Sequence, residues 1–113
     1  MLFRSQAPVE KWAAAVQVTG LPQGLEHARY CALGLRRVLE ACPSVDGVQL
    51  RMNAEAGVPE GEQTEFYRPL FRALAEFQST ARPQAPLRLD LRYKGLTQAM
   101  IDAAVQEKLD VTV

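Results

Sequence analysis

The feature that most constrains the fold is a strict alternation of apolar and polar side chains in residues 87–92, Leu-Arg-Leu-Asp-Leu-Arg. Successive side chains of a β-strand point to opposite faces, so this segment predicts a strand with one leucine face and one charged face. A sheet covered by helices on both faces would need strands that are apolar throughout. The alternation therefore favours a sheet that packs on helices on one side and presents charges on the other.

The same alternation recurs in residues 48–53, Val-Gln-Leu-Arg-Met-Asn, and a further strand is predicted to begin at Asp110. Elsewhere apolar residues recur at intervals of three and four, which predicts amphipathic helices. These helices are expected at residues 23–42, around residues 66–77, and at residues 98–108. The order helix, strand, helix, strand, helix, strand is typical of parallel sheets with helical crossovers.

Prolines and polar caps define the expected helix ends. Pro22 and Pro43 flank the first helix, and Thr97 is expected to cap the third. Pro69 is compatible with the second helix without distortion only if that helix begins so late that Pro69 falls in its first turn. An earlier start predicts a kink at Pro69.

The polar strand faces fit a closed barrel better than an open doubly wound sheet. In a TIM-type barrel, the leucine faces pack on the outer helices and polar side chains at the strand ends look into the barrel mouth. Such a barrel needs eight strands and about 250 residues, whereas this chain has 113. We therefore predict an α/β fold that is part of a (β/α)8 barrel, with about three parallel strands alternating with helices. Residues 1–113 would form one incomplete segment of the barrel, and residues 1–8 a disordered or non-native start.

The composition excludes several classes of partner. Thirteen Lys and Arg residues balance 13 Asp and Glu residues, so the chain lacks the net charge that favours nucleic acid or an anionic membrane surface. No apolar run approaches the roughly 20 residues that cross a bilayer. The first residues are too short for a secretory signal. We expect a soluble protein whose compartment the sequence does not define.

The thiols and the single histidine predict no metal site. Cys31 and Cys42 lie eleven positions apart on one predicted helix, about 16 Å along its axis, which is beyond disulfide reach. We expect both to be reduced. His27 has no partner at a zinc-binding spacing and is expected to be solvent-exposed. The sequence predicts neither a metal nor a cofactor.

Charged side chains gather at the expected carboxyl ends of the first two strands. In a β/α barrel, these ends and the loops after them form the active site. Carboxylates there can transfer protons, and cations can bind anionic groups of a substrate. The predicted site consists of the carboxylates Glu55 and Asp90, the cations Arg51, Arg92 and Lys94, and the amide Asn53.

A structural interpretation of the same residues stays open. The alternating charges could simply face water, with Asp90 in a structural salt bridge to Arg51, Arg88 or Arg92. Glu55 would then be a solvated loop carboxylate.

Residues 48–59, Val-Gln-Leu-Arg-Met-Asn-Ala-Glu-Ala-Gly-Val-Pro, resemble the strand-and-loop segment of α-glucuronidase-type glycoside hydrolases. In that segment a basic residue, an Asn and a Glu alternate before a loop rich in Gly and Pro. The chain also resembles related, uncharacterised bacterial β/α-barrel proteins, which continue into a strand of basic and acidic residues and a Lys-Gly turn. Residues 90–95, Asp-Leu-Arg-Tyr-Lys-Gly, match that continuation. The likeness in arrangement covers residues 45–113.

This resemblance implies a carbohydrate-active protein that hydrolyses a glycosidic bond. Glu55 would be the general acid, and Asp90, or a carboxylate outside this chain, would activate water or attack the sugar. The substrate-binding residues would be Arg51, Asn53, Arg92 and Lys94, which would contact sugar oxygens or a uronate.

The alternative is a non-catalytic carbohydrate-binding or structural α/β fragment with no activity of its own. In either case the expected partners are a carbohydrate and either the remaining barrel strands or further copies of the chain.

Overall fold

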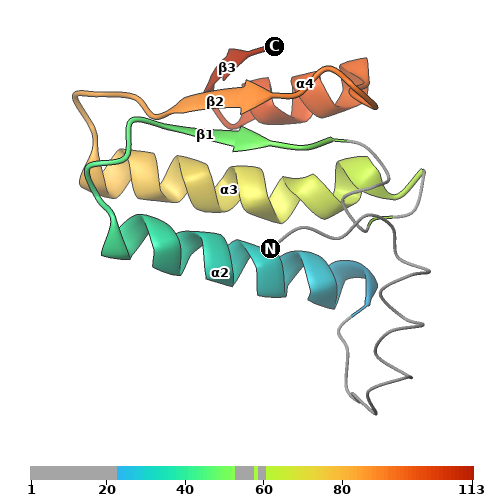
Figure 1. The fold of residues 1–113 in the computed structure, drawn as a ribbon, viewed down its shortest axis with the longest axis horizontal. Helices are drawn as coiled ribbons and strands as arrows, with labels where there is room; N and C mark the ends of the chain where they lie inside the picture. The colour runs from blue at the N-terminus through green and yellow to red at the C-terminus, as the bar shows by residue number, and fades with distance from the viewer. Residues whose placement is uncertain (1–22, 53–57, 59–60) are drawn as a thin grey trace.

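The computed structural model describes residues 23–52, 58 and 61–113 of the chain. Within these residues helices and strands alternate as predicted (Figure 1). The expected start at residues 1–8 lies outside the described residues, as do Asn53 and Glu55. The described elements are α2 (Gly24–Ala41), β1 (Gly47–Leu50), α3 (Gln63–Ala81), β2 (Arg88–Leu91), α4 (Gln98–Gln106) and β3 (Asp110–Thr112).

The three described strands form a parallel sheet in the order β1-β2-β3 (Figure 1). Each adjacent pair is joined through a helix, and such crossovers are almost always right-handed, which places α3 and α4 on the same face of the sheet. Gly47 begins β1 at a point of close approach, because a Cβ there would lie 3.1 Å from the carbonyl oxygen of Arg88. The register makes an apolar row of Val48, Leu89 and Val111 and a polar row of Gln49, Asp90 and Thr112.

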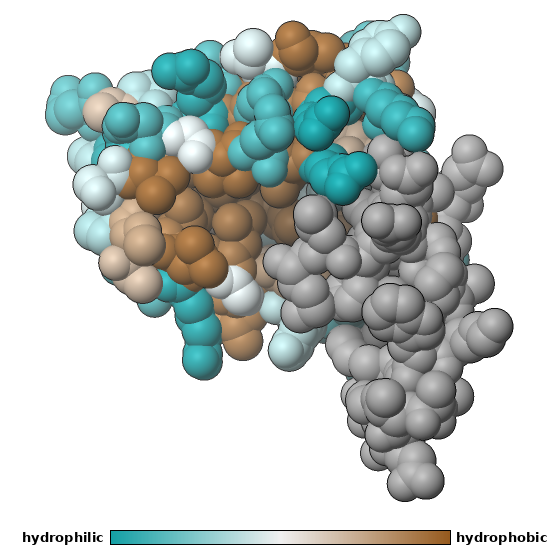
Figure 2. Space-filling view, viewed as in Figure 1, coloured by the Kyte–Doolittle hydropathy of each residue, from teal (hydrophilic) through white to brown (hydrophobic). Residues whose placement is uncertain are grey.

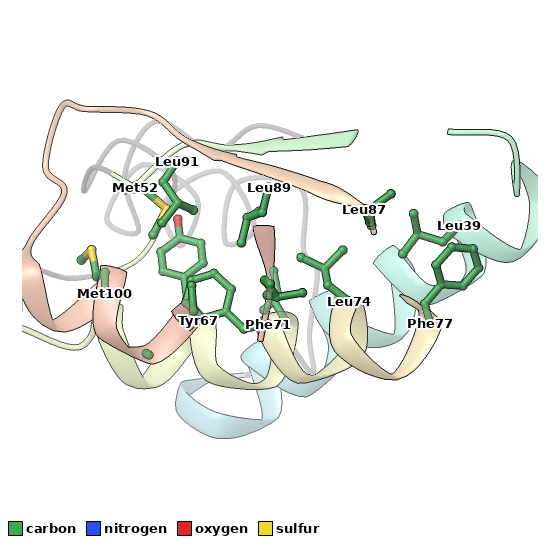
Figure 3. Close-up of a cluster of buried hydrophobic side chains, with 14 residues drawn as sticks. Leu39, Met52, Tyr67, Phe71, Leu74, Phe77, Leu87, Leu89, Leu91 and Met100 are labelled. Carbon is green, nitrogen blue, oxygen red and sulfur yellow. The ribbon is translucent and has the colours of Figure 1, made fainter. Parts of the chain in front are cut away.

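The core lies between the leucine face of β2 and helix α3. Leu87, Leu89 and Leu91 are fully buried, whereas Arg88 and Arg92 are exposed, which confirms the predicted alternation. Figure 3 shows the three leucines pointing toward the aromatic and aliphatic side chains of α3. Burial of a leucine side chain contributes about 1.5–3 kcal/mol, so this contact is a principal source of stability for the sheet.

Helix α4 packs on the same core and begins where the sequence predicts. The side-chain oxygen of Thr97 accepts a hydrogen bond from the backbone N–H of Met100 at 3.3 Å, which confirms the predicted cap. Met100 and Ala104 are fully buried. Both belong to the same hydrophobic cluster as the leucines of β2, so α3 and α4 cover one face of the sheet.

Helix α2 lies alongside α3 (Figure 1). It contributes Ala28 and Leu39 to the buried interior. Figure 2 shows apolar side chains gathered on the surface where α2 and β1 lie. Four large apolar side chains of α2 are more than half exposed: Leu25, Tyr30, Leu33 and Val38.

The amino ends of β1 and β2 are tied to the end of α3 by one arginine. Arg82 follows α3, and its guanidinium donates a hydrogen bond to the carbonyl of Val45 and lies 3.2 Å from the Asp46 carboxylate. The backbone N–H of Arg88 donates to the carbonyl of Asp46 at 3.0 Å. These contacts fix the end of the sheet opposite to the predicted site.

The structure excludes one of the two alternatives for Pro69. Helix α3 begins at Gln63, so Pro69 lies in its second turn, and the late start that would place Pro69 in the first turn does not occur. Pro69 has no N–H to donate to the carbonyl of Glu65, one turn earlier, and the helix is maintained through this gap by its packing on the core.

The expected exposure of His27 is also wrong. Its ring lies on that of Phe66 in α3, with 5.0 Å between the ring centroids and 60° between the planes. The contact leaves His27 partly buried, and this burial lowers the pKa of His27 below its ordinary value. The contact could not be anticipated from the first helix alone, because Phe66 comes from a different helix.

Cys31 and Cys42 are both free thiols. None of the three described helices has the length and apolar character that crossing a bilayer requires.

The lowered pKa of His27 predicts a pH-dependent stability. Because the folded state binds the proton less readily than the unfolded state, the free energy of unfolding should decrease as pH falls from 7.5 through about 6.5 and level off below the folded-state pKa. Urea unfolding between pH 7.5 and 5 tests this in a chain with a single histidine. His27→Gln should remove the dependence in this range, and equal slopes for both proteins would contradict it.

The exposed apolar side chains of α2 predict self-association of the isolated chain. Sedimentation at increasing concentration should show a mass that rises above that of the monomer. The double variant Tyr30→Gln/Val38→Gln should remain monomeric, because its two sites lie two turns apart on one side of α2. Arg37→Gln, on the same helix, should associate as the parent does. A parent chain that is monomeric at all concentrations would contradict the prediction, because these side chains would then remain exposed to water.

Candidate functional site

The polar face of the sheet carries a hydrogen-bonded pair at its centre. Gln49 of β1 and Asp90 of β2 are register partners, and the side-chain amide of Gln49 donates to Asp90 Oδ2 at 2.6 Å. Thr112 of β3 lies on the other side of Asp90 in the same row. Asp90 is half-buried, whereas Gln49 and Thr112 are exposed. The carboxylate is thus held in a defined position while it still faces solvent.

Cationic residues precede and follow Asp90 along the chain. Arg88 and Arg92 flank Asp90 at the two neighbouring positions of the same strand face, and both are exposed. Lys94 follows in a turn that closes with a hydrogen bond from the N–H of Leu96 to the carbonyl of Tyr93, at 3.0 Å. The surface therefore combines one oriented carboxylate with several side chains that can bind anionic oxygens.

The first strand ends earlier than the sequence predicts. Pairing in β1 ends at Leu50, whose carbonyl accepts from the N–H of Arg92 at 3.0 Å, whereas the alternation predicted a strand to Asn53. The next two carbonyls are bound by side chains of α3. The hydroxyl of Tyr67 donates to the carbonyl of Arg51, and the amide of Gln63 donates to that of Met52 at 3.0 Å.

Tyr67 is a buried polar group with a clear structural partner. Burial of its ring and hydroxyl, together with the nearby Cys31 thiol, raises the pKa of Tyr67 to about 12. The hydroxyl therefore keeps its proton at neutral pH and remains a hydrogen-bond donor.

The predicted site residues that the structure describes lie in β2 or directly after β1 and β2. Arg51 follows β1 directly and is half-buried, and the backbone pairing of Leu50 with Arg92 brings the two strand ends together. Asp90 lies in β2, with Arg92 and Lys94 directly after it. Asn53 and Glu55, the remaining predicted residues, lie outside the described part of the chain.

The contact between Gln49 and Asp90 was not predicted from the sequence. It depends on the register between strands, which one sequence does not define. Tyr93, which follows β2, is 84% exposed, the largest exposed fraction among the large apolar side chains described.

A groove on the surface lies away from this site. A groove of about 490 Å³ runs between α2 and α3, on the helical side of the molecule. Arg36 of α2 and Glu76 of α3 pair across it at 3.0 Å, and both side chains are about half exposed. Exposed ion pairs of this kind contribute about 0–1 kcal/mol. The groove is a seam between two helices and lies away from the predicted site residues.

The described residues contain no group of three or more His, Cys, Asp or Glu side chains placed to hold a metal ion. No protein-family model matches the chain, and no curated protein or solved structure shows significant similarity to it.

The Gln49–Asp90 pair predicts a measurable coupling. A double-mutant cycle with Gln49→Ala and Asp90→Ala should give a coupling free energy of about 0.5–1.5 kcal/mol in urea unfolding, because the bond is made to a half-buried carboxylate. Gln98 and Asp102, which bond at 2.9 Å on the exposed side of α4, provide a matched control with an expected coupling of about 0.2–0.5 kcal/mol. A coupling at Gln49–Asp90 no larger than the control would mean that the sheet pair does not form in solution.

Proposed function

We propose that the polar face of the sheet is the carbohydrate-binding surface of a TIM-type β/α barrel to which β1, β2 and β3 contribute. The observation that carries the proposal is the oriented Asp90 carboxylate among cations at the carboxyl ends of parallel strands. In β/α barrels this end of the sheet holds the active site.

The placement of the helices supports the barrel. Helices α3 and α4 share one core with the leucine face of β2. The opposite face carries amide, carboxylate, hydroxyl and guanidinium groups. A barrel satisfies both conditions, since its helices lie outside the strands and its polar strand ends line the mouth.

The chemistry of the surface suits a sugar that bears an acidic group. Asp90 can accept hydrogen bonds from sugar hydroxyls in addition to the one from Gln49. Arg51 and Arg92 can bind a carboxylate through two parallel N–H donors, and Lys94 adds a further positive charge. A uronic acid sugar carries both kinds of group.

Hydrolysis of a glycosidic bond is the reaction that the resemblance to α-glucuronidases supports. Glu55 would protonate the leaving oxygen while a second carboxylate activates water or attacks the sugar. Asp90 is the candidate for that second role. The separation of the two carboxyl groups, about 5 Å or about 6.5–9.5 Å, would distinguish a retaining from an inverting reaction.

A non-catalytic carbohydrate-binding role is the second candidate. The hydrogen bond from Gln49 favours it, because an amide partner holds Asp90 as an acceptor without supplying or removing a proton. Arg51, Asn53, Arg92 and Lys94 would bind the sugar in the same way in both cases.

The hydrolytic proposal predicts a defined effect of Glu55→Gln in the intact protein. Turnover of a glycoside with a poor leaving group should fall by roughly 10²–10⁴-fold, because the variant lacks the proton donor, while binding should persist. A glycoside whose leaving group needs no proton should be affected much less. Steady-state kinetics with both substrates measure the difference.

Asp90→Asn provides the contrast for this experiment. If Asp90 only binds and orients the sugar, the variant should weaken affinity for both substrates alike. Sugar binding without turnover in the parent protein would support the non-catalytic role. Absence of both binding and turnover across uronosides and neutral glycosides would contradict the proposal.

A further inference from the structure

Two buried side chains of α3 hold the segment that leaves β1. Gln63 and Tyr67 lie one helical turn apart, and they donate to the adjacent carbonyls of Met52 and Arg51 respectively. These are the first two carbonyls after strand pairing ends at Leu50. Figure 3 shows Tyr67 pointing from α3 toward Met52. We refer to Gln63 and Tyr67 together as the α3 clamp.

The burial of the clamp shows that its contacts are specific. Gln63 is 7% exposed, and it is a polar side chain buried among the apolar side chains of the described core. Tyr67 is 3% exposed. A buried amide or hydroxyl without a partner is strongly unfavourable, so each side chain requires the carbonyl it binds. Met52 is itself fully buried, which leaves water no access to replace the bond at its carbonyl.

The Tyr67 ring has little freedom to move. It stacks on Phe71, with 6.0 Å between ring centroids and 20° between the planes, and meets the edge of Phe66 at 5.2 Å. The hydroxyl is therefore presented from a fixed position in the core. A rigid donor of this kind fixes the carbonyl that it contacts and the peptide group to which that carbonyl belongs.

The clamped peptide groups adjoin the predicted site. Arg51 carries one of the two bound carbonyls, and its side chain belongs to the proposed sugar-binding surface. The carbonyl of Met52 shares its peptide group with the N–H of Asn53, the next residue along the chain and another predicted sugar ligand. A shift of about 1 Å in such a segment can reduce the function of a site by about 10²-fold.

We infer that Gln63 and Tyr67 are positioning residues, which set the path of the chain after β1 and thereby the placement of the sugar-binding residues. This inference rests on the proposed function for its consequence on binding. A positioning role can be distinguished from a packing role, because a substitution can remove the hydrogen-bonding group of either residue and keep its volume.

Two isosteric variants test the inference. Tyr67→Phe keeps the ring and loses the hydroxyl, and Gln63→Met keeps the chain length and loses the amide. Ala103→Gly, at a buried position of α4, is the control, because it weakens a helix of the same core and leaves both hydrogen-bonding groups of the clamp in place. The first measurement needs no ligand: it records the NMR shifts and hydrogen exchange of the Met52 and Asn53 amides, which share peptide groups with the clamped carbonyls.

The clamp variants should shift both amides and increase their exchange at least tenfold beyond the change in the Ala103→Gly variant. The second measurement is the affinity for methyl glucuronoside by NMR titration of the intact protein. Affinity should fall at least threefold in the clamp variants and remain at the parental value in Ala103→Gly.

The two measurements separate the possible failures. Amide shifts and exchange that match those of Ala103→Gly would overturn the inference, since the chain path would then not depend on the clamp. Perturbed amides with an unchanged affinity would overturn it as well, because the path of the chain would then have no effect on the sugar-binding residues. A parent protein that binds no methyl glucuronoside would count against the proposed ligand, and the amide measurement would still decide whether the clamp sets the chain path.

Discussion

The structure depends on the contact between the leucine face of β2 and helix α3. Leu87, Leu89 and Leu91 are fully buried against a row of large side chains that includes Phe71 and Leu74. Because strand side chains alternate, this burial also forces the intervening residues onto the opposite face. The polar surface is thus a direct consequence of the core, and a shift of one residue in register would exchange the two.

Patterns within single elements made the order of helices and strands predictable. The alternation in residues 87–92 defined a one-sided strand, and the cap at Thr97 located the start of α4. Pro69 was the exception, because the core contacts of α3 outweigh the local preference for ending or starting a helix there. Tertiary contacts of this kind have no signature in the segment itself.

The alternation of side chains was predictable, and the contacts between strands were less so. The strand pattern placed Asp90 on the polar face of β2, where the register sets it beside Gln49 and Thr112. The partner of Asp90 depends on register, and the end of β1 depends on donors that come from α3. Both are relations between elements, which a periodicity cannot reveal.

The tie at the amino ends of the strands has a consequence for how this protein can change during evolution. Arg82 secures Val45 and Asp46 at the end of the sheet away from the predicted ligands. Substitutions at the exposed positions of the other end can therefore accumulate while the folding of the sheet is preserved. Gln63 and Tyr67 limit this tolerance, because they are buried in the core and also bind the chain where it leaves β1. Descendants of this protein should vary around these two residues and retain them.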